Sequence, residues 1–335
     1  MKLLVTFFCL FGTLALGMEE GAPINVQPSE HQIQQQIPIE SPHEFLAWYN
    51  LLSQEAKQAL RNEVRGIFFY TCPCCGECTE HPLARAKVLK LLVAHAKQLL
   101  KSYGHDRIFG LGQSPAYFVE TAKLLQVLYG KPIGHIKKID FSGSFLKSSK
   151  KGLVPAYVLK HQRPSRKELS YYRQYLTSLG LDPISIINAY FGGARTIIVD
   201  YANSGCGLAS FLMILKNWAK ELGCHRALCT ALHTDILVTQ HKAPLHLFIN
   251  PCKHQLNQNI EYLGCTDEFD DRLVSHFSFK YWKEKFDPAH FSPSRNARLF
   301  MFHVLDQLML SGLDPKRLRY TMSETYGEIF GCPID

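Results

Sequence analysis

The sequence contains few of the features that mark membrane proteins, nucleic-acid-binding proteins and cysteine enzymes. Beyond residues 1–17, no segment of the 335-residue chain approaches the roughly 20 apolar residues that a membrane-spanning helix needs. The net charge is only +8, which favours anionic small molecules without indicating nucleic acid. No cysteine, histidine and acidic residue are placed together by the sequence as a nucleophilic or redox centre.

The N-terminal segment has the order of a secretory signal. Lys2 precedes an apolar run from Leu3 to Leu16, and Gly17 stands just before the acidic Glu19. This order predicts a signal peptide over residues 1–17, with an uncleaved anchor as the alternative. We therefore expect export from the cytoplasm, as a secreted or periplasmic protein or by delivery into a host cell. After removal of the signal we expect no membrane contact.

Composition divides the rest of the chain into four parts. Residues 18–42 are rich in Gln, Pro and Glu and lack apolar density, which predicts a flexible linker. Residues 43–104 read as a helical extension, because Ser41 and Pro42 begin an amphipathic pattern. Strand and helix patterns alternate over residues 105–250. Residues 251–335 form a C-terminal extension with a helix expected near residues 295–309.

The densest reactive cluster consists of the four cysteines Cys72, Cys74, Cys75 and Cys78, followed by His81. Four thiolates around a glycine turn can converge on one Zn²⁺ in a tetrahedral site, so a zinc site is one interpretation. In an exported protein the same thiols can instead form disulfides. The distant cysteines available for such pairing include Cys224, Cys229, Cys252, Cys265 and Cys332.

The segment that organises the chain covers residues 195–208. A run of β-branched residues ends at Asp200, the turn Ser204-Gly205-Cys206-Gly207 follows, and an apolar periodic stretch begins at Leu208. The pattern predicts a strand, a tight loop and the start of a helix. The first N–H groups of such a helix favour a phosphate group. A carboxylate at the end of the strand can accept hydrogen bonds from two neighbouring sugar hydroxyls.

This segment resembles the 5-phosphoribosyl-diphosphate (PRPP) signature of type I phosphoribosyltransferases. The resemblance implies that Ser204, Gly205, Cys206 and Gly207 hold the 5′-phosphate. It also implies that Asp200 is the catalytic residue that orients the ribose hydroxyls, with Mg²⁺ bridging the diphosphate. Tyr201 stands where the family pattern has a second acidic residue.

A second turn of the same kind lies earlier in the chain. Residues 107–111 predict a strand, Gly112-Gln113-Ser114 a turn, and Pro115 the start of a helix. The resemblance implies that this turn binds pyrophosphate, although an ordinary strand-to-helix turn explains it as well. A later loop carries Lys147, Lys150 and Lys151, which either neutralise the leaving pyrophosphate or form a solvated lysine run.

The alternation predicts an α/β fold of mainly parallel strands with helices on both faces, like that of a phosphoribosyltransferase. The expected ligand is PRPP or a related phosphorylated ribose. The expected reaction transfers the phosphoribosyl group to a nitrogen acceptor with release of pyrophosphate. The alternative is a catalytically inactive secreted or translocated binding protein that retains the phosphate cradle. Asp140 reaching the ribose site would favour the enzyme, and Tyr201 filling it would favour the binding protein.

Overall fold

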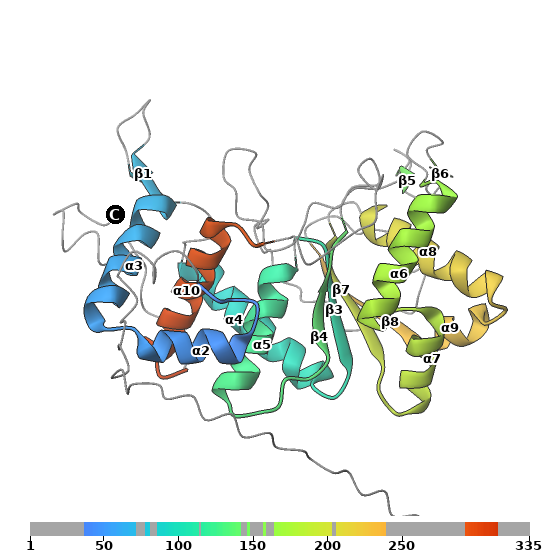
Figure 1. Cartoon of the computed structure of the whole chain (residues 1–335), viewed down its shortest axis with the longest axis horizontal. Helices are drawn as coiled ribbons and strands as arrows, with labels where there is room; N and C mark the ends of the chain where they lie inside the picture. The colour runs from blue at the N-terminus through green and yellow to red at the C-terminus, as the bar shows by residue number, and fades with distance from the viewer. Residues whose placement is uncertain are drawn as a thin grey trace, which may run out of the picture. The chain divides into compact units, whose positions relative to one another are not determined.

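The computed structural model describes nine parts of the chain, namely residues 37–71, 78–80, 86–113, 115–141, 146–147, 157–158, 164–202, 206–238 and 292–313. They contain a four-stranded sheet whose strands are all parallel, together with helices (Figure 1). The expected α/β class is therefore confirmed. None of the helices in these parts is long and apolar enough to cross a membrane.

The sheet has the order β4 (Ile136–Ile139), β3 (Arg107–Leu111), β7 (Thr196–Ala202) and β8 (Leu232–Val238). The chain runs outward from β3 to β4, returns past β3 to β7, and continues to β8. The direction of winding therefore reverses between β3 and β7. Ile197, Ile198 and Val199 are fully buried, as expected for a parallel strand that is covered on both faces.

One face of the sheet is covered by α5 (Ala116–Leu128), which contacts β3 and β4 and packs against α4 (Ala86–Tyr103). A Cβ atom at Gly110 of β3 would lie 2.6 Å from Cγ2 of Val119 on α5. The helix therefore approaches the strand more closely than a side chain at position 110 would allow. Glu120 of α5 is buried and accepts ion pairs from Lys123, at 2.8 Å, and from Lys138 of β4, at 3.1 Å.

Three further helices extend this layer. They are α2 (Pro42–Leu51), α3 (Gln54–Phe68) and α10 (Arg295–Leu310), and both α2 and α10 contact α5. Asp306 of α10 is 1% exposed and accepts hydrogen bonds from Tyr49 Oη at 2.7 Å and from Arg61 Nε at 2.8 Å. This network joins α2, α3 and α10 through one buried carboxylate, although the chain segments are far apart in sequence.

The opposite face is covered by α6 (Arg166–Leu179), α7 (Pro183–Phe191), α8 (Cys206–Glu221) and α9 (His225–Ala231). Their apolar side chains share one core with the sheet residues Phe109, Leu111, Ile139 and Ile198. The two helical layers follow from the reversal of winding, because right-handed crossovers that run in opposite directions along a sheet place their helices on opposite faces.

The helix ends show why most elements begin where the sequence predicts. Ser41 accepts a hydrogen bond from the N–H of Glu44 at the start of α2, and Ser165 and Glu168 form a capping box at the start of α6. After α8, Gly223 adopts a positive φ of 71°, as expected for a helix C-terminus. The predicted strand over residues 107–111 and the predicted helix near residues 295–309 are confirmed.

Other features go beyond what the sequence pattern indicates. The alternation over residues 105–250 gives no separate signal for α7 or α9, because each helix is short. It also leaves open the bounds of β4, which covers only Ile136–Ile139, and of β8, which begins at Leu232. Ile37 and Ile39, in the stretch expected to be a flexible linker, are only 1% and 3% exposed.

Two short antiparallel pairs complete the described elements. The first joins β1 (Phe69–Thr71) to β2 (Cys78–Glu80), and the second joins β5 (Leu146–Lys147) to β6 (Tyr157–Val158). Strand β5 contacts α8.

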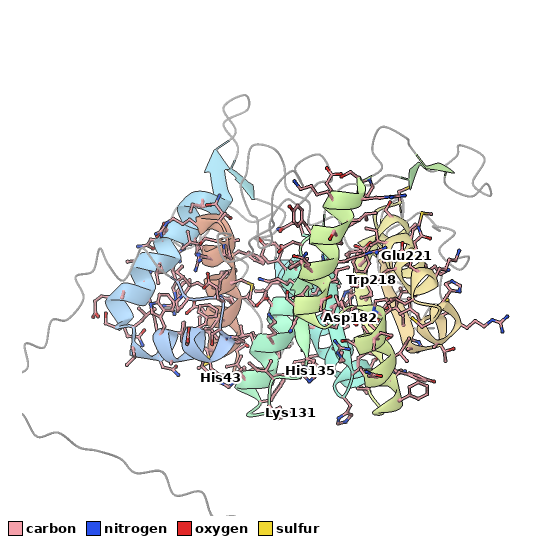
Figure 2. All side chains as sticks on the ribbon, turned by 45° about the vertical axis from the view of Figure 1, so that its right-hand side comes forward. His43, Lys131, His135, Asp182, Trp218 and Glu221 are labelled. Carbon is pink, nitrogen blue, oxygen red and sulfur yellow. The ribbon has the colours of Figure 1, made fainter. Side chains whose placement is uncertain are left out.

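The amino-terminal edge of the sheet is held by ion pairs and hydrogen bonds. Arg195, just before β7, binds both carboxylate oxygens of the buried Asp106, just before β3, with distances down to 2.6 Å. Figure 2 labels His135 and Lys131 where the chain enters β4 at this edge. The carboxyl ends of all four strands lie at the opposite edge, because the strands are parallel.

Candidate functional site at the carboxyl edge of the sheet

The structure brings together the ends of the two strands after which the ligand turns are expected. Strands β3 and β7 are neighbours, with Gly110 in register with Val199, so the residues that directly follow β3 and the start of α8 after β7 lie at the same edge. Gly112 and Gln113 follow β3, and α8 begins at Cys206 shortly after β7 ends. This is the point at which the winding reverses, where ligands bind in open α/β sheets.

The backbone at Gly112 requires glycine for two independent reasons. Its φ is +73°, and a Cβ atom at this position would lie only 2.5 Å from the carbonyl oxygen of Phe141. Its N–H donates to the carbonyl of Ile139 at 2.8 Å. Gln113 closes the turn, because its carbonyl accepts a hydrogen bond from the N–H of Ala116 at 3.0 Å. The turn after β3 is therefore fixed against the end of β4.

Asp200 lies near the end of β7 and is half-buried, in register with Ile236 of β8. Alternation along the strand places it on the same face as Ile198, which is the face covered by α6 and α8. Tyr201 continues β7 in register with Leu237. The carboxylate thus shares its face of the sheet with the helix that begins at Cys206.

The first turn of α8 contains Cys206 and Gly207, both half-buried. The helix is 16 residues long, and its early backbone N–H groups, with the positive end of its dipole, provide the setting expected for a phosphate. The hydroxyl of Ser210 donates to the carbonyl of Cys206 at 2.7 Å. Ser114, Ser204 and Gly205, which the sequence assigns to the two turns, lie outside the described residues.

The structure adds Asp140, which the sequence identifies only as a carboxylate of undefined position. Asp140 directly follows β4, between the two residues that contact Gly112. Tyr175 Oη accepts from its backbone N–H at 2.9 Å and donates to its Oδ2 at 3.2 Å. Tyr172 Oη donates to its backbone carbonyl at 3.3 Å. Two tyrosines of α6 therefore hold one half-buried aspartate at the carboxyl edge.

These tyrosines act as neutral donors. Both are buried, and burial raises the pKa of Tyr172 and of Tyr175 well above the usual range, with the charge of Asp140 acting in the same direction. The sequence gives a signal for this contact, since two aromatic hydroxyls three residues apart share one side of a helix. The position of their partner depends on the packing of α6 against β4, which the sequence does not specify.

The remaining candidates lie elsewhere. Cys78 belongs to β2, and Cys72, Cys74 and Cys75 lie outside the described residues. Cys224 and Cys229, considered above as disulfide partners, carry free thiols. Among the described residues, no three His, Cys, Asp or Glu side chains are grouped as metal ligands.

Of the three lysines in the expected pyrophosphate loop, the structure describes one. Lys147 lies in β5, which contacts α8, whereas Lys150 and Lys151 lie outside the described residues. The backbone of β5 thus runs beside the helix that begins the expected phosphate cradle.

Comparison of the chain with protein-family models, with curated proteins and with solved structures finds no match.

Proposed function

We propose that this protein binds PRPP or a related phosphorylated ribose at the carboxyl edge of its sheet, in the manner of a phosphoribosyltransferase. The observation that carries the proposal is the pairing of β3 with β7, because it sets Gly112 and Gln113 after β3 beside the start of α8 after β7, where the winding reverses. One turn alone is common in α/β sheets. Two adjacent turns allow one ligand to be held at both of its phosphorylated ends.

Each part of the site has a distinct role in this proposal. The start of α8, with Ser204, Gly205, Cys206 and Gly207, holds the 5′-phosphate through backbone N–H groups, the Ser204 hydroxyl and the helix dipole. Asp200 accepts hydrogen bonds from the ribose hydroxyls. The turn formed by Gly112, Gln113 and Ser114 binds the diphosphate.

Catalysis would then depend on position and charge. With the sugar fixed at both ends, the bond between the anomeric carbon and the diphosphate oxygen lies in the path of a nitrogen nucleophile. The bond to nitrogen forms as the bond to oxygen breaks, pyrophosphate leaves with the bonding electrons, and the nitrogen loses its proton. Hydrogen-bond donors at the turn after β3 stabilise the charge that develops on the leaving group.

Mg²⁺ fits this site by the chemistry of its donors. The carboxylates of Asp140 and Asp200 stand at the same edge of the sheet, and Mg²⁺ is usually bound by one or two carboxylates together with substrate phosphates. When bound, the cation supplies neutralisation of the diphosphate charge.

The second candidate function is a binding protein that holds the same ligand without turnover. Tyr201 supports it, because a phenol at this position removes a carboxylate that the phosphoribosyltransferase pattern places beside the ribose. Export, expected from residues 1–17, is also easier to combine with ligand binding than with a reaction that consumes a cytosolic metabolite.

The test is calorimetric titration of the full chain with PRPP and Mg²⁺. We expect binding in the micromolar range, weakened at least tenfold by Asp200→Asn and by Ser204→Ala. Asp182→Asn is the matched control. Asp182 caps α7 and Asn caps nearly as well, and Asp182 lies near Arg107 at the start of β3, away from the carboxyl edge.

No binding by the wild-type chain would exclude the proposal, and so would equal affinity of the Asp200 variant. If binding is found, release of pyrophosphate in the presence of a panel of nucleobases separates the two candidate functions. An enzyme releases pyrophosphate with at least one nitrogen acceptor, whereas a binding protein retains intact PRPP.

A further inference from the structure

Helix α9 carries a histidine and a cysteine one turn apart. The Nε2 atom of His225 and the Sγ atom of Cys229 lie 3.7 Å apart, and both side chains are half-buried. Residues four positions apart lie on the same side of a helix, so the two donor atoms share one face of α9. Helix α9 leads into the amino-terminal end of β8, so this face is separate from the carboxyl edge of the sheet.

The distance between the two donor atoms matches one edge of a tetrahedral zinc site. Zn²⁺ binds a cysteine sulfur at about 2.3 Å and a histidine nitrogen at about 2.0–2.1 Å, and the tetrahedral angle then places the two ligand atoms about 3.6 Å apart. The observed distance of 3.7 Å is already close to this value. As a hydrogen bond the same contact is weak, because a thiol is a poor donor. The geometry therefore suits an ion that both atoms share.

The free thiol of Cys224 stands nearby but cannot join Cys229 in a disulfide. Cys224 is the N-cap residue of α9, five positions before Cys229, and it packs against the core of its layer. Five residues of helix separate the two Cα atoms by about 7.5 Å along the axis, and a disulfide requires less than about 7 Å. The same five residues turn the helix by about 140° beyond one full turn, so Cys224 is on another side. Cys224 is therefore an internal comparison for Cys229.

We propose that His225 and Cys229 together bind one Zn²⁺ ion, whose remaining positions are open to water. The thiol of Cys229 releases its proton to solvent as the sulfur–zinc bond forms, and His225 binds through Nε2 as the neutral imidazole. One thiolate and one imidazole are typical zinc ligands, whereas Mg²⁺ prefers oxygen. With two protein ligands instead of four, the site should bind zinc more weakly than a structural zinc site. The inference does not depend on the proposed ribose site.

The experiment compares the rates at which iodoacetamide alkylates individual cysteines of the full chain, reduced with a non-thiol reductant, with and without Zn²⁺. Trypsin cleaves after Arg226, so mass spectrometry reads Cys224 and Cys229 in different peptides. This separation keeps the readout independent of zinc bound at any other cysteines. The thiolate is the group that reacts, so we expect Zn²⁺ to slow alkylation of Cys229 by about tenfold or more and to leave Cys224 within about twofold.

Two alanine variants test the histidine. His225→Ala should abolish the zinc protection of Cys229, while the thiol itself still reacts. His135→Ala is the matched control, because His135 is exposed just before β4, outside α9, and should leave the protection unchanged. A second measurement needs no variant: the imidazole carbons of His225 should shift when the wild-type chain is titrated with Zn²⁺ and followed by NMR.

Three outcomes would overturn the inference. Unchanged alkylation of Cys229 in the presence of Zn²⁺ would show that no ion binds there. Equal protection of Cys224 and Cys229 would show unspecific binding of zinc to thiols. Protection of Cys229 that is unchanged in His225→Ala would show that the sulfur binds zinc without the histidine.

Discussion

Lowering the pH from 6.5 to about 4 should destabilise the fold through His303. His303 lies on α10, is 5% exposed, and its Nε2 has no hydrogen-bond partner among the described residues. Burial lowers the pKa of His303 from 6.5 to about 4, although the charge of Asp306 opposes the shift. The opposition is limited because Arg61 and Tyr49 already bind that carboxylate.

The sign of the effect follows from which state binds the proton first. In the unfolded chain His303 takes up a proton near pH 6.5, whereas in the folded chain it remains neutral down to about pH 4. The stability is therefore complete above pH 6.5 and decreases as the pH falls from 6.5 to about 4. One pKa unit corresponds to about 1.4 kcal/mol, so the total loss from this residue is about 3 kcal/mol. Burial also lowers the pKa of His95 and of His233, which adds to the loss in the same direction.

The assay is urea unfolding of the full chain at several pH values between 7.5 and 4.5, followed by tryptophan fluorescence. His303→Leu should make the unfolding free energy less dependent on pH by about 2.5 kcal/mol over this range, because pH 4.5 is still above the pKa of His303 in the folded chain. His43→Leu is the control, because His43 is exposed at the start of α2 and should leave the pH dependence unchanged.

A variant that retains the wild-type pH dependence would refute the reasoning. Should His303→Leu fail to fold, the pKa of His303 can be measured in the wild-type chain by NMR titration of its imidazole carbons. A value near 6.5 would contradict the burial argument just as directly.

Two stability predictions follow from other contacts. Gly112→Ala should lower the unfolding free energy by clearly more than Gly130→Ala. Both residues have a positive φ, which costs an alanine about 1–2 kcal/mol. Only at position 112 would the new Cβ atom also lie 2.5 Å from the carbonyl oxygen of Phe141, because position 130 faces open space. Equal losses in urea unfolding would show that the close approach is not rigid. Tyr49→Phe should lower the unfolding free energy by about 1.5–3 kcal/mol, because it removes a 2.7 Å hydrogen bond to the buried carboxylate of Asp306. A loss below about 0.5 kcal/mol, the size of the effect of an ordinary surface substitution, would mean that Arg61 alone satisfies the carboxylate.

The parts of the fold that could be predicted from sequence are those set by local chemistry. The β-branched run before Asp200, the glycine turn after residue 111 and the capping residues Ser41 and Ser165 each determine their element through nearby atoms. The parallel order also follows from alternation of strands and helices. As the pattern predicts, β3 is followed directly by Gly112 and Gln113, and α8 begins shortly after the end of β7.

The contacts that the sequence could not specify join distant segments. The pairing of β3 with β7 depends on how the whole sheet winds, and the hold of Tyr175 on Asp140 depends on where α6 crosses the sheet. Likewise, Asp306 meets Tyr49 and Arg61 across 257 and 245 residues. No local sequence pattern predicts these hydrogen bonds, because each of the three side chains is of a type that is common in helices.

The central position of the β3–β7 pair has a consequence for how the chain is made. Arg107 of β3 is in register with Thr196 of β7, a separation of 89 residues. At a synthesis rate of about 5–20 residues per second, β3 waits on the order of 5–20 s for its partner. During this interval β4 can pair with one edge of β3, while the backbone N–H and C=O groups of its other edge, which later pair with β7, stay open to any extended chain nearby. Strand β7 covers the open edge of β3 and at the same time brings Asp200 and the start of α8 to the candidate site. A ligand of this site can therefore bind only after β3 has found its partner strand.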